Sequence, residues 1–422
     1  MRRSTPRLLS SSPNICIVGG GAIGLSSALH LLQSSPSPSI TLVERDSTYR
    51  VNSAVLSAGG VRSQFSLKEN VECSLYGLEV FKKNGLNDLL KKANPSASPV
   101  DLQFMNGGYL FLSSTLSGSS CLTKNLKLQK SLGAANTELL HGEEVGREFP
   151  YLNTEDLRMG CYSKDDGWFD PYSFLTGVRE GIKPRIREGK KLTEIETENN
   201  KITRMKIDGE WQAFDFVVNA TGANANSVID KIPNIRRLPV EARKRTIFHF
   251  KCKDVPHPDP TSHIPPLTVD PSGVWYRSTS ALTSESSGDF ICGCTPTEDD
   301  EQDAERHTDD IDPDYSLWEE VIWPKLYERC EAFGGAKVLN QWAGWYEYNV
   351  KDQNGIVGFH PDCSNLILAN GFSGHGLQQS PAVGRAVSEL VEDGKFRTID
   401  LDRFKFERFE EEGGLIFEEG IV

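Results

Sequence analysis

The turn between the first expected strand and the first expected helix constrains this chain more than any other feature. Asn14 to Gly24 reads NICIVGGGAIG, an apolar run followed by closely spaced glycines, and the helical pattern SSALHLL comes next. In a strand–turn–helix unit with this GxGxxG spacing, the first glycine allows the tight turn and the second lets a pyrophosphate approach the backbone. The third lets the helix pack on the strand. This turn predicts a dinucleotide site that includes Gly19, Gly21, Ala22, Ile23 and Gly24.

A second apolar run, residues 40–43, supports the same interpretation. It ends in Glu44 and Arg45, and Glu44 stands twenty residues after Gly24, where an acid binds the ribose of a dinucleotide. The helix after Gly24 offers unpaired N–H groups to a phosphate, but a helix end contributes only about 1–2 kcal/mol. Many other contacts must therefore hold the ligand, and the turn alone does not decide between NAD and FAD.

Length, charge and the ends of the chain set the broad class. With 422 residues, the chain is expected to form two domains. The formal net charge of −13 argues against a nucleic-acid surface, and no apolar run reaches the roughly 18 residues of a membrane span. The leader, residues 1–13, holds three Arg, four Ser and no acid. It fits either a short transit peptide or a disordered basic tail.

The nine cysteines show no disulfide framework and no metal framework. Cys292 and Cys294 form the closest pair, and no second pair stands at the spacing of a zinc site. We therefore expect reduced thiols, mostly buried, and no metal centre. The acidic stretch over residues 298–314 is expected to be a solvated loop, because it lacks the glycine turn of a calcium loop.

Three later segments place small residues where a ligand could meet bare backbone. They span residues 52–65, 214–228 and 368–381, and each could instead be an ordinary loop or strand–helix turn. Together they favour a resident flavin enclosed by distant segments over an exchangeable NAD. The candidate cofactor-binding residues in them are Ser57, Gly59, Gly60, Thr221, Gly222, Gly371, Ser373, Gly374, His375, Gly376 and Leu377.

The order of the motifs resembles a known family. GGGAIG, ERD, SAGG, VVNATGA, WAG, DQNGIVG and GFSGHGL follow one another as in the FAD-dependent amine and amino-acid oxidoreductases related to D-amino-acid and sarcosine oxidases. DDGWFDP at 165–171, LPVEARKR at 238–245, WAGWYEYNVKDQNGIVG at 342–358 and GFSGHGLQQSP at 371–381 are similar to one animal subfamily of mitochondrial flavoproteins. The resemblance covers essentially the whole chain from Asn14.

The resemblance implies an α/β fold in which a Rossmann-like FAD-binding domain is interleaved with an α+β substrate domain on a mixed or antiparallel sheet. The FAD-binding domain would take residues 14–81, 150–232 and 339–422, and the substrate or cap domain would take residues 82–149 and 233–338. Alternating runs at 107–112, 246–251 and 274–277 fit strands of the second domain. Asp170 followed by Pro171 predicts the start of a helix.

The resemblance also implies a reaction and its residues. FAD would take a hydride from the carbon beside an amine nitrogen, while the protein orients the substrate. Arg277 is the best candidate for holding a substrate carboxylate, because a planar guanidinium matches two oxygens, and Arg62 is the second. His375 is the candidate for a polar group at the flavin ring. Each of the three could instead make a structural ion pair or hydrogen bond.

Two departures from sarcosine-oxidase-like relatives bear on the substrate. Gln378 stands where those relatives carry a lysine, and Phe65 stands where they carry a second arginine. The loss of two usual carboxylate holders argues against small amino-acid substrates. The positions of covalent flavin attachment fall near Trp345 and Ser57, so FAD is expected to be non-covalent.

Residues 177–197 are the weakest part of the expected cofactor domain. Pro184 interrupts the expected helix, and no convincing apolar strand follows before Leu192. The sequence therefore predicts an incomplete wall around the adenine, or a chain that is shortened here.

The subfamily resemblance implies a cellular role. The protein would be mitochondrial, on the matrix side or peripheral to the inner membrane, and would support assembly of the respiratory NADH dehydrogenase complex (complex I). Its partners would be complex I subunits or assembly intermediates, with a small amine or amino-acid-like substrate. Two alternatives stay open: a metabolic amine or N-methyl amino-acid dehydrogenase or oxidase, and a non-catalytic scaffold that has lost FAD.

Overall fold

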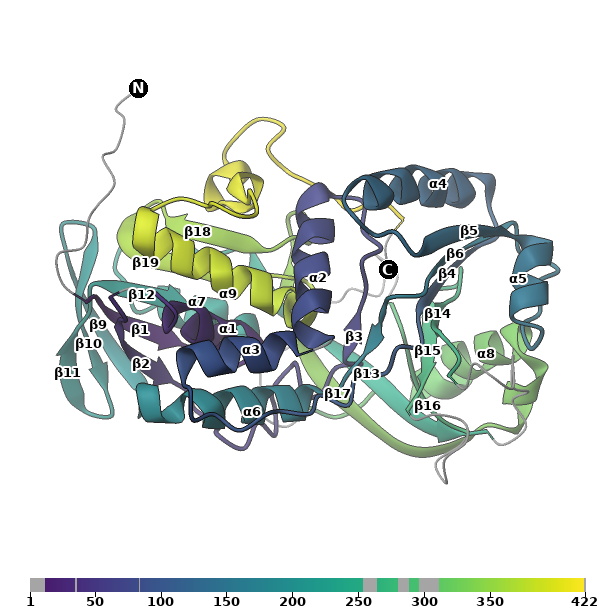
Figure 1. Cartoon of the computed structure of the whole chain (residues 1–422), viewed down its shortest axis with the longest axis horizontal. Helices are drawn as coiled ribbons and strands as arrows, with labels where there is room; N and C mark the ends of the chain where they lie inside the picture. The colour runs from purple at the N-terminus through teal and green to yellow at the C-terminus, as the bar shows by residue number, and fades with distance from the viewer. Residues whose placement is uncertain are drawn as a thin grey trace.

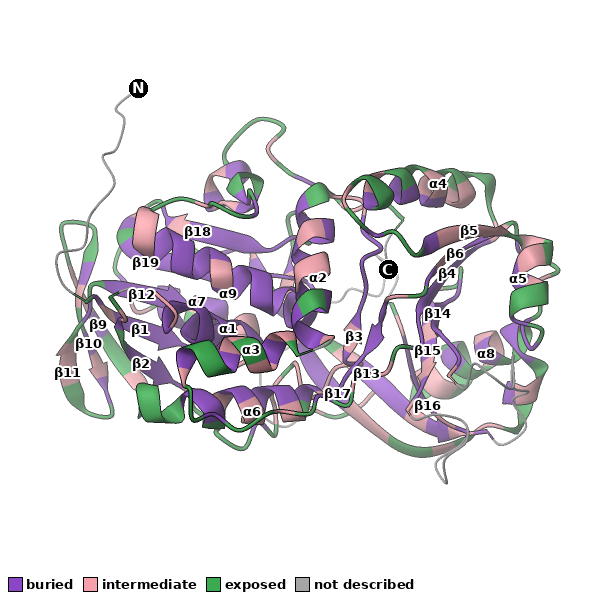
Figure 2. Ribbon diagram, viewed as in Figure 1, coloured by how far each residue is buried: buried purple, intermediate pink, exposed green. Residues whose placement is uncertain are grey.

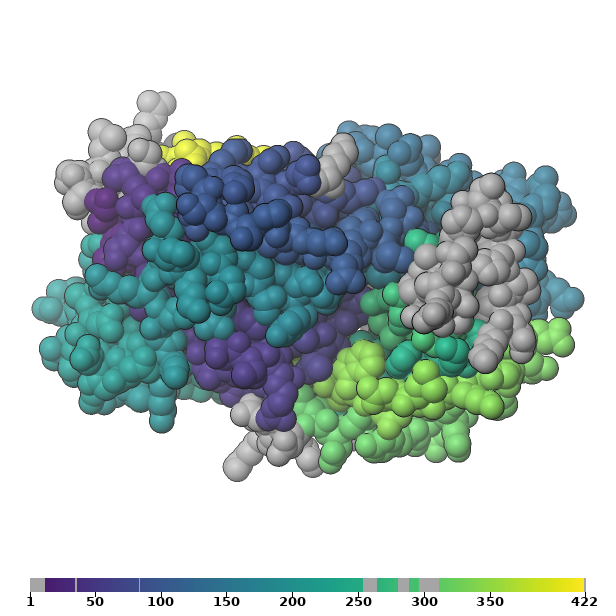
Figure 3. All heavy atoms as spheres, turned by 60° about the horizontal axis from the view of Figure 1, so that its bottom comes forward, coloured from purple at the N-terminus to yellow at the C-terminus, as the bar shows by residue number. Residues whose placement is uncertain are grey.

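The computed structural model describes residues 12–34, 36–82, 84–252, 264–279, 288–295 and 311–420. This part of the chain forms two lobes side by side, each on its own sheet (Figure 1). The acidic stretch 298–314 lies largely outside the described residues, as does nearly all of the leader. In the space-filling view, segments far apart in the sequence share one face, where purple N-terminal residues lie against teal and green segments (Figure 3).

The first lobe is built on a six-stranded sheet in the order β18-β19-β12-β1-β2-β8. Its strands are β1 (Asn14–Val18), β2 (Ser39–Val43), β8 (Arg187–Gly189), β12 (Phe216–Asn219), β18 (Ile356–His360) and β19 (Cys363–Asn370). All neighbouring pairs are parallel except β18 with β19. The carboxyl ends of β1, β2, β12 and β19 therefore meet at one edge, where ligands bind in open parallel sheets.

Helices cover this sheet and bury its apolar side chains. They are α1 (Ala22–Leu31), α2 (Lys68–Phe81), α3 (Gly85–Ala93), α6 (Pro171–Ile182), α7 (Ala225–Ile229) and α9 (Gly376–Asp393). The long α9 is buried along most of its length (Figure 2). A small sheet of β9 (Leu192–Glu198), β10 (Lys201–Ile207) and β11 (Glu210–Ala213) packs beside the six-stranded sheet.

Asp170 caps α6, because its carboxylate accepts hydrogen bonds from the N–H groups of Tyr172 and Ser173, as the Asp-Pro pair predicted. Pro381 lies in the second turn of α9 and has no N–H to donate to the carbonyl of Leu377.

The second lobe is built on an eight-stranded mixed sheet in the order β17-β13-β16-β15-β14-β4-β6-β5. Its strands are β4 (Tyr109–Ser113), β5 (Thr137–His141), β6 (Met159–Ser163), β13 (Val240–Lys251), β14 (Leu267–Val269), β15 (Val274–Ser278), β16 (Asp289–Cys294) and β17 (Lys337–Asn349). Only β14 and β4 pair in parallel. The helices α4 (Leu116–Ser131), α5 (Gly142–Glu148) and α8 (Trp323–Arg329) belong to this lobe (Figure 1).

The two sheets divide the chain somewhat differently from the predicted segment boundaries. Although α3 begins after residue 81, Leu86 and Leu90 join the core beneath the first sheet. Conversely, β6 and all of β17 pair within the second sheet. A two-stranded antiparallel sheet of β3 (Gly60–Val61) and β7 (Gly167–Trp168) lies where the lobes meet (Figure 1). The chain crosses between the lobes at the ends of helices and strands. The sequence alone locates these crossing points only coarsely.

Candidate functional site

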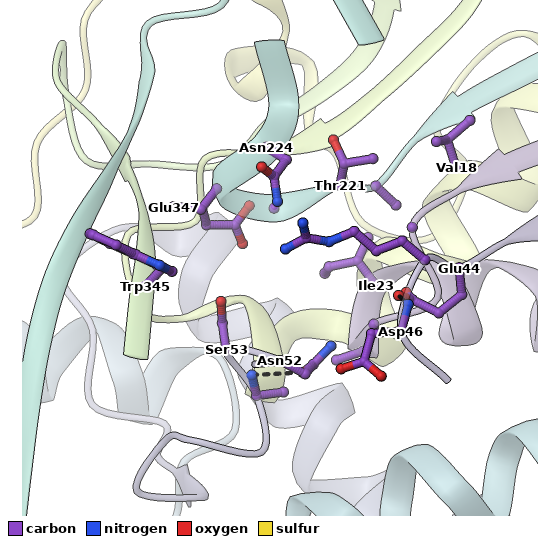
Figure 4. A pocket seen from close by; sticks show the side chains of 18 of the residues that line it. Val18, Ile23, Glu44, Asp46, Asn52, Ser53, Thr221, Asn224, Trp345 and Glu347 are labelled. Carbon is purple, nitrogen blue, oxygen red and sulfur yellow. Dashed lines mark hydrogen bonds between the residues drawn. The ribbon is translucent and has the colours of Figure 1, made fainter. Parts of the chain in front are cut away.

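A cavity of about 440 Å³ lies at the carboxyl edge of the first sheet and extends toward β17. Its size falls within the range of about 300–1,000 Å³ that is usual for ligand pockets. Glu44 and Asp46 lie at one end and Trp345 and Glu347 at the other (Figure 4). Twelve of the predicted cofactor-binding residues line it: Gly19, Gly21, Ala22, Ile23, Glu44, Arg45, Ser57, Thr221, Gly222, Gly374, Gly376 and Leu377.

The turn after β1 leaves room for a pyrophosphate. Gly19 has φ +104°, which favours glycine, and its N–H donates to Val43 O at 2.9 Å. A Cβ on Gly24 would lie 1.8 Å from Gly19 O, so this glycine permits the close approach of α1 to β1. A Cβ on Gly21 would meet only the amide of Asn52, at 3.2 Å, and no side chain caps α1. The residues present therefore fit an anionic group above the helix N-terminus.

At the other side of this turn, Glu44 is already engaged with backbone. One carboxylate oxygen accepts from Gly20 N–H at 2.8 Å and the other from Asp46 N–H at 2.8 Å. These bonds fix the carboxylate at the end of β2, on the wall of the cavity. A carboxylate oxygen has more than one lone pair, so each retains capacity for a ribose hydroxyl.

The wall beyond Glu44 is present, contrary to the expectation for residues 177–197. Following α6, the chain forms β8, which pairs in parallel with β2 in the register Thr41 with Arg187. Lys190, Lys191 and Leu192 then line the cavity. The strand escaped notice because it has three residues, two of them exposed and charged, and therefore no apolar pattern.

Six predicted cofactor residues lie off the cavity wall: Gly24, Gly59, Gly60, Gly371, Ser373 and His375. At Gly60, and at Gly374 in the loop after β19, glycine is required because another side chain of the protein packs against the backbone. A Cβ on Gly60 would lie 2.3 Å from the hydroxyl of Tyr109, and one on Gly374 would lie 2.5 Å from the ring of Tyr346. The chain's own phenol rings therefore occupy the space that these glycines leave. That the glycines clear room for a flavin ring stays a prediction.

The structure brings Arg62 and His375 together. The Arg62 guanidinium donates to His375 Nε2 at 3.1 Å, and the Arg62 backbone N–H donates to the Gln378 side chain at 2.7 Å. Burial, together with the nearby guanidinium, lowers the pKa of His375 to about 3. The imidazole is therefore neutral near pH 7, with Nε2 as an acceptor.

Phe65 and Gln378, the two departures from sarcosine-oxidase-like relatives, both contact the pair formed by Arg62 and His375 or its backbone. Phe65 packs edge-on against His375, with ring centroids 4.9 Å apart, and its ring centroid lies 4.9 Å from the Arg62 guanidinium carbon. Gln378 accepts from the backbone of Arg62. Both positions where such relatives carry cations therefore hold residues that fix Arg62 here.

Arg277 lies on β15, and its side chain reaches the segment before β3. Its Nε donates to Ala58 O at 2.8 Å, its Nη1 donates to Ser278 O at 2.9 Å, and its guanidinium lies 5.3 Å from the Trp168 ring centroid. Burial lowers the pKa of Arg277 to about 10, so it remains charged at neutral pH. No carboxylate among the described residues forms an ion pair with it.

Several lining residues carried no signal in the sequence. Lys231 follows α7 and its C-cap, and Glu347 belongs to β17, a strand of the second lobe. Only the pairing of β17 with β13, with Ala242 opposite Glu347, brings this strand to the cavity. The residues that sequence reasoning missed are Asp46, Tyr49, Asn52, Lys190, Lys191, Asn224, Lys231 and Glu347.

Other expectations concern thiols, metals and membranes. Seven of the nine cysteines are buried, and no disulfide joins two cysteines within the described part of the chain. Within the described ranges, no group of three potential metal ligands comes together. Across the same part of the chain, none of the helices combines the length and apolar character that crossing a bilayer requires.

Comparison with known proteins places these features in a family. A family model described as FAD dependent oxidoreductase matches residues 14–390. FAD-dependent oxidoreductase domain-containing protein 1 of Bos taurus is 36% identical over 440 residues, which cover 96% of this chain and 86% of that protein. Among solved structures, L-proline dehydrogenase from P. horikoshii has a TM-score of 0.76 at 24% identity, covering 97% of this chain and 100% of that chain. Glycine oxidase from Geobacillus kaustophilus has a TM-score of 0.73 at 18% identity, covering 93% and 98%.

Proposed function

This chain belongs to the FAD dependent oxidoreductase family, and from that premise we propose that it oxidises an amine or amino-acid-like substrate beside FAD held in the cavity described above. When bound, FAD supplies the hydride acceptor for such a reaction. The chain binds the cofactor, orients the substrate and excludes water. The observation that carries the proposal is a single cavity that runs from the glycine turn at β1 to the strand β17 of the other lobe.

Within this cavity, each wall has a distinct part. We assign the pyrophosphate to the turn at Gly19 and Gly21, where backbone lies open, and the adenosine ribose to Glu44. Lys190 and Lys191 lie on the same wall beyond Glu44 and supply positive charge at the adenosine end of the cavity. The opposite end, at Trp345 and Tyr346, faces the second lobe and takes the flavin end of the cofactor.

Arg277 is the proposed carboxylate holder. Its guanidinium is partly buried, still charged, and bonded only to backbone carbonyls and a tryptophan face in its described contacts. A partly buried cation with no paired anion loses hydration, and a substrate carboxylate would offset that cost. The planar guanidinium of arginine donates hydrogen bonds to two carboxylate oxygens at once, which also fixes the orientation of the substrate.

His375 is assigned a positioning part. Its Nε2 already accepts from Arg62, and its low pKa keeps it neutral. The imidazole therefore holds Arg62 and adds no positive charge of its own. We propose that Arg62, fixed by His375 and Gln378, provides positive charge for the substrate next to the loop whose Gly374 and Gly376 line the flavin end of the cavity.

The first experiment is a visible absorption spectrum of the purified protein before and after denaturation. Flavin absorption bands with FAD released into the supernatant are expected, because the described residues that line the cavity include no cysteine or histidine to form a covalent link. Flavin that stays with the polypeptide would contradict non-covalent binding. A colourless protein that takes up no added FAD would favour the scaffold alternative.

The second experiment tests turnover with a panel of amines and N-alkyl amino acids and an artificial electron acceptor. For a substrate that is oxidised, Arg277→Ala is expected to raise KM by about tenfold to a hundredfold, equivalent to about 1.4–2.7 kcal/mol, with the flavin spectrum unchanged. Arg204→Ala is the matched control, since Arg204 is half-exposed and pairs with Glu196 far from the cavity. An unchanged KM in Arg277→Ala would remove this residue from the substrate site.

We also propose that the protein acts in mitochondria, on the matrix side or peripheral to the inner membrane, and supports assembly of complex I. The support lies in the sequence: an acid-free leader with three Arg, and motifs similar to a mitochondrial subfamily. Fractionation should place the protein with the matrix, and native electrophoresis should show comigration with complex I intermediates. Robust amine oxidation without any such comigration would favour the metabolic alternative.

A further inference from the structure

Glu347 is a partly buried acid on the wall of the cavity, and it holds the loop between β19 and α9 at two points. Its Oε2 accepts from Gly371 N–H at 2.9 Å, and its backbone carbonyl accepts from Ser373 N–H at 3.1 Å. A Cβ on Gly376 would lie 2.8 Å from Oε1. The carboxylate points away from the Trp345 side, toward the part of the cavity that carries Asn224 (Figure 4).

The surroundings of this carboxyl favour its neutral form. No cation among the described residues lies within ion-pair distance of Glu347. Burial raises its pKa to about 7, even though the N–H groups of Gly371 and Phe372 act in the opposite direction. The carboxyl therefore changes charge close to neutral pH while facing the proposed cofactor site.

The charge state of Glu347 also depends on the charged and titratable groups of the surrounding elements. On the paired strand β13 these are Glu241, Arg243, Lys244 and Arg245, and beside the loop they are His375 and Arg62. On the cavity wall they are Glu44, Arg45, Asp46, Tyr49, Lys190, Lys191, Lys231 and Tyr346. Of the groups in the loop, His375 is neutral at pH 7 because its pKa is about 3.

We propose that Glu347 takes up a proton when FAD binds, so that this carboxyl couples the affinity for FAD to pH. The inference rests on the proposed placement of FAD in the cavity. Filling the cavity removes the remaining water from the carboxyl, which favours its neutral form. The pyrophosphate brings negative charge into the same cavity, and like charges disfavour a second anion there.

The sign of the coupling follows from linkage. A group whose pKa is higher in the complex than in the free protein binds a proton as the ligand binds. The affinity for FAD is therefore greatest below about pH 7 and falls as the pH rises from 7 toward the pKa of the complex. For one coupled proton, the dissociation constant rises by at most about tenfold per pH unit over that range.

The test variant is Glu347→Gln. A glutamine has the same length, accepts from Gly371 N–H through its amide oxygen and cannot titrate. Glu241→Gln is the matched control, because Glu241 is an exposed glutamate on the paired strand, opposite Tyr348, and pairs with Arg243. Thermal unfolding of each apoprotein establishes that the variants are folded before titration.

The experiment titrates apoprotein with FAD by flavin fluorescence from about pH 6 to about 8.5, a range in which FAD itself has no titrating group. Parallel calorimetry in buffers of different ionisation enthalpy measures the protons taken up. The native protein and Glu241→Gln are expected to bind more weakly as pH rises above 7 and to take up a proton at pH 7.5. In Glu347→Gln, both the slope and the proton uptake should fall by more than half.

Each result bears on the proposal. If the native protein binds FAD with a dissociation constant that changes less than about twofold between pH 6 and 8.5, the coupling is wrong while the cofactor site stands. Equal slopes in the native protein and Glu347→Gln would assign the proton to another group and also overturn it. If neither protein binds FAD at any pH, both the proposal and the proposed function fail.

Discussion

The turn after β1 and the loop after β19 are both glycine-rich connections from a strand to a helix, and both lie at the same cavity. In the first, the cavity side is open: a Cβ on Gly21 would meet only the amide of Asn52, at 3.2 Å. In the second, the space is taken by the protein itself, because Gly374 faces the ring of Tyr346 and Gly376 faces the carboxylate of Glu347. Similar glycine density therefore leaves open space beside the cavity in one place and permits internal packing in the other.

The largest effect should come from a position in the first turn that serves the fold rather than the ligand. In Gly24→Ala, the new Cβ would lie 1.8 Å from Gly19 O, and relief requires separating α1 from β1. We expect a loss of more than about 3 kcal/mol of unfolding free energy, measured by urea denaturation of the apoprotein.

Gly394→Ala is the control for that measurement. Gly394 ends α9 with φ +70° and has open space around its missing Cβ, so alanine there should cost only about 1 kcal/mol. Equal losses in the two variants would show that the close approach at Gly24 does not decide stability.

Gly21→Ala should separate folding from ligand binding. The nearest obstacle is the end of the flexible Asn52 side chain, so the apoprotein should lose less than about 1 kcal/mol. The added methyl group stands where the pyrophosphate would approach, so the dissociation constant for FAD should rise about a hundredfold, equivalent to about 2.7 kcal/mol. Fluorescence titration measures it. Unchanged affinity would mean that the phosphates lie elsewhere.

Gly374→Ala should behave in the opposite way, with a loss in the apoprotein. Its φ of +91° and the Tyr346 ring at 2.5 Å predict a cost of about 2 kcal/mol without any ligand. In a double-mutant cycle, Tyr346→Ala should recover about 1 kcal/mol of that loss. A fully stable Gly374→Ala apoprotein with weakened FAD binding would make the second loop resemble the first and would break the comparison.

The same contrast explains what the sequence could predict. The first turn is local: strand, three glycines and helix stand within one short segment, so β1 and the glycine roles follow from spacing alone. The start of α6 at Asp170 is equally local. Similarity of motifs extended this to the family, its cofactor and its two-sheet fold.

Contacts between distant segments could not be predicted in this way. Glu347 and Tyr346 reach the cavity through the register of β17 on β13, and nothing in WAGWYEYN specifies that register. The strand β8 is too short and too polar to show a period, so the wall at Lys190 was missed. The partners of Gly60 and Gly374, two tyrosines far away in the sequence, were equally invisible to spacing arguments.

A smaller effect should show that the segment beside Arg62 is held by buried polar groups as well as by packing. Asp166 accepts from the N–H and the hydroxyl of Ser63, each at 3.0 Å, and so fixes the segment next to Arg62. Burial raises the pKa of Asp166 to about 7, above its ordinary value of 3.8. The unfolded chain therefore releases this proton at lower pH than the folded chain.

The contribution of the protonated Asp166 carboxyl to the free energy of unfolding is therefore fully present below about pH 4. It is lost as the pH rises to about 7, by at most about 1.4 kcal/mol per pH unit. Relative to Asp166→Asn, the native protein should lose about 1–2 kcal/mol of unfolding free energy between pH 5 and 7. Asp165→Asn, at a half-exposed neighbour that pairs with Lys82, should show no such difference. If Asp166→Asn and the native protein keep a constant difference across this range, the carboxyl is ionised throughout. The segment beside Arg62 would then be held by a charge, and pH would not loosen it.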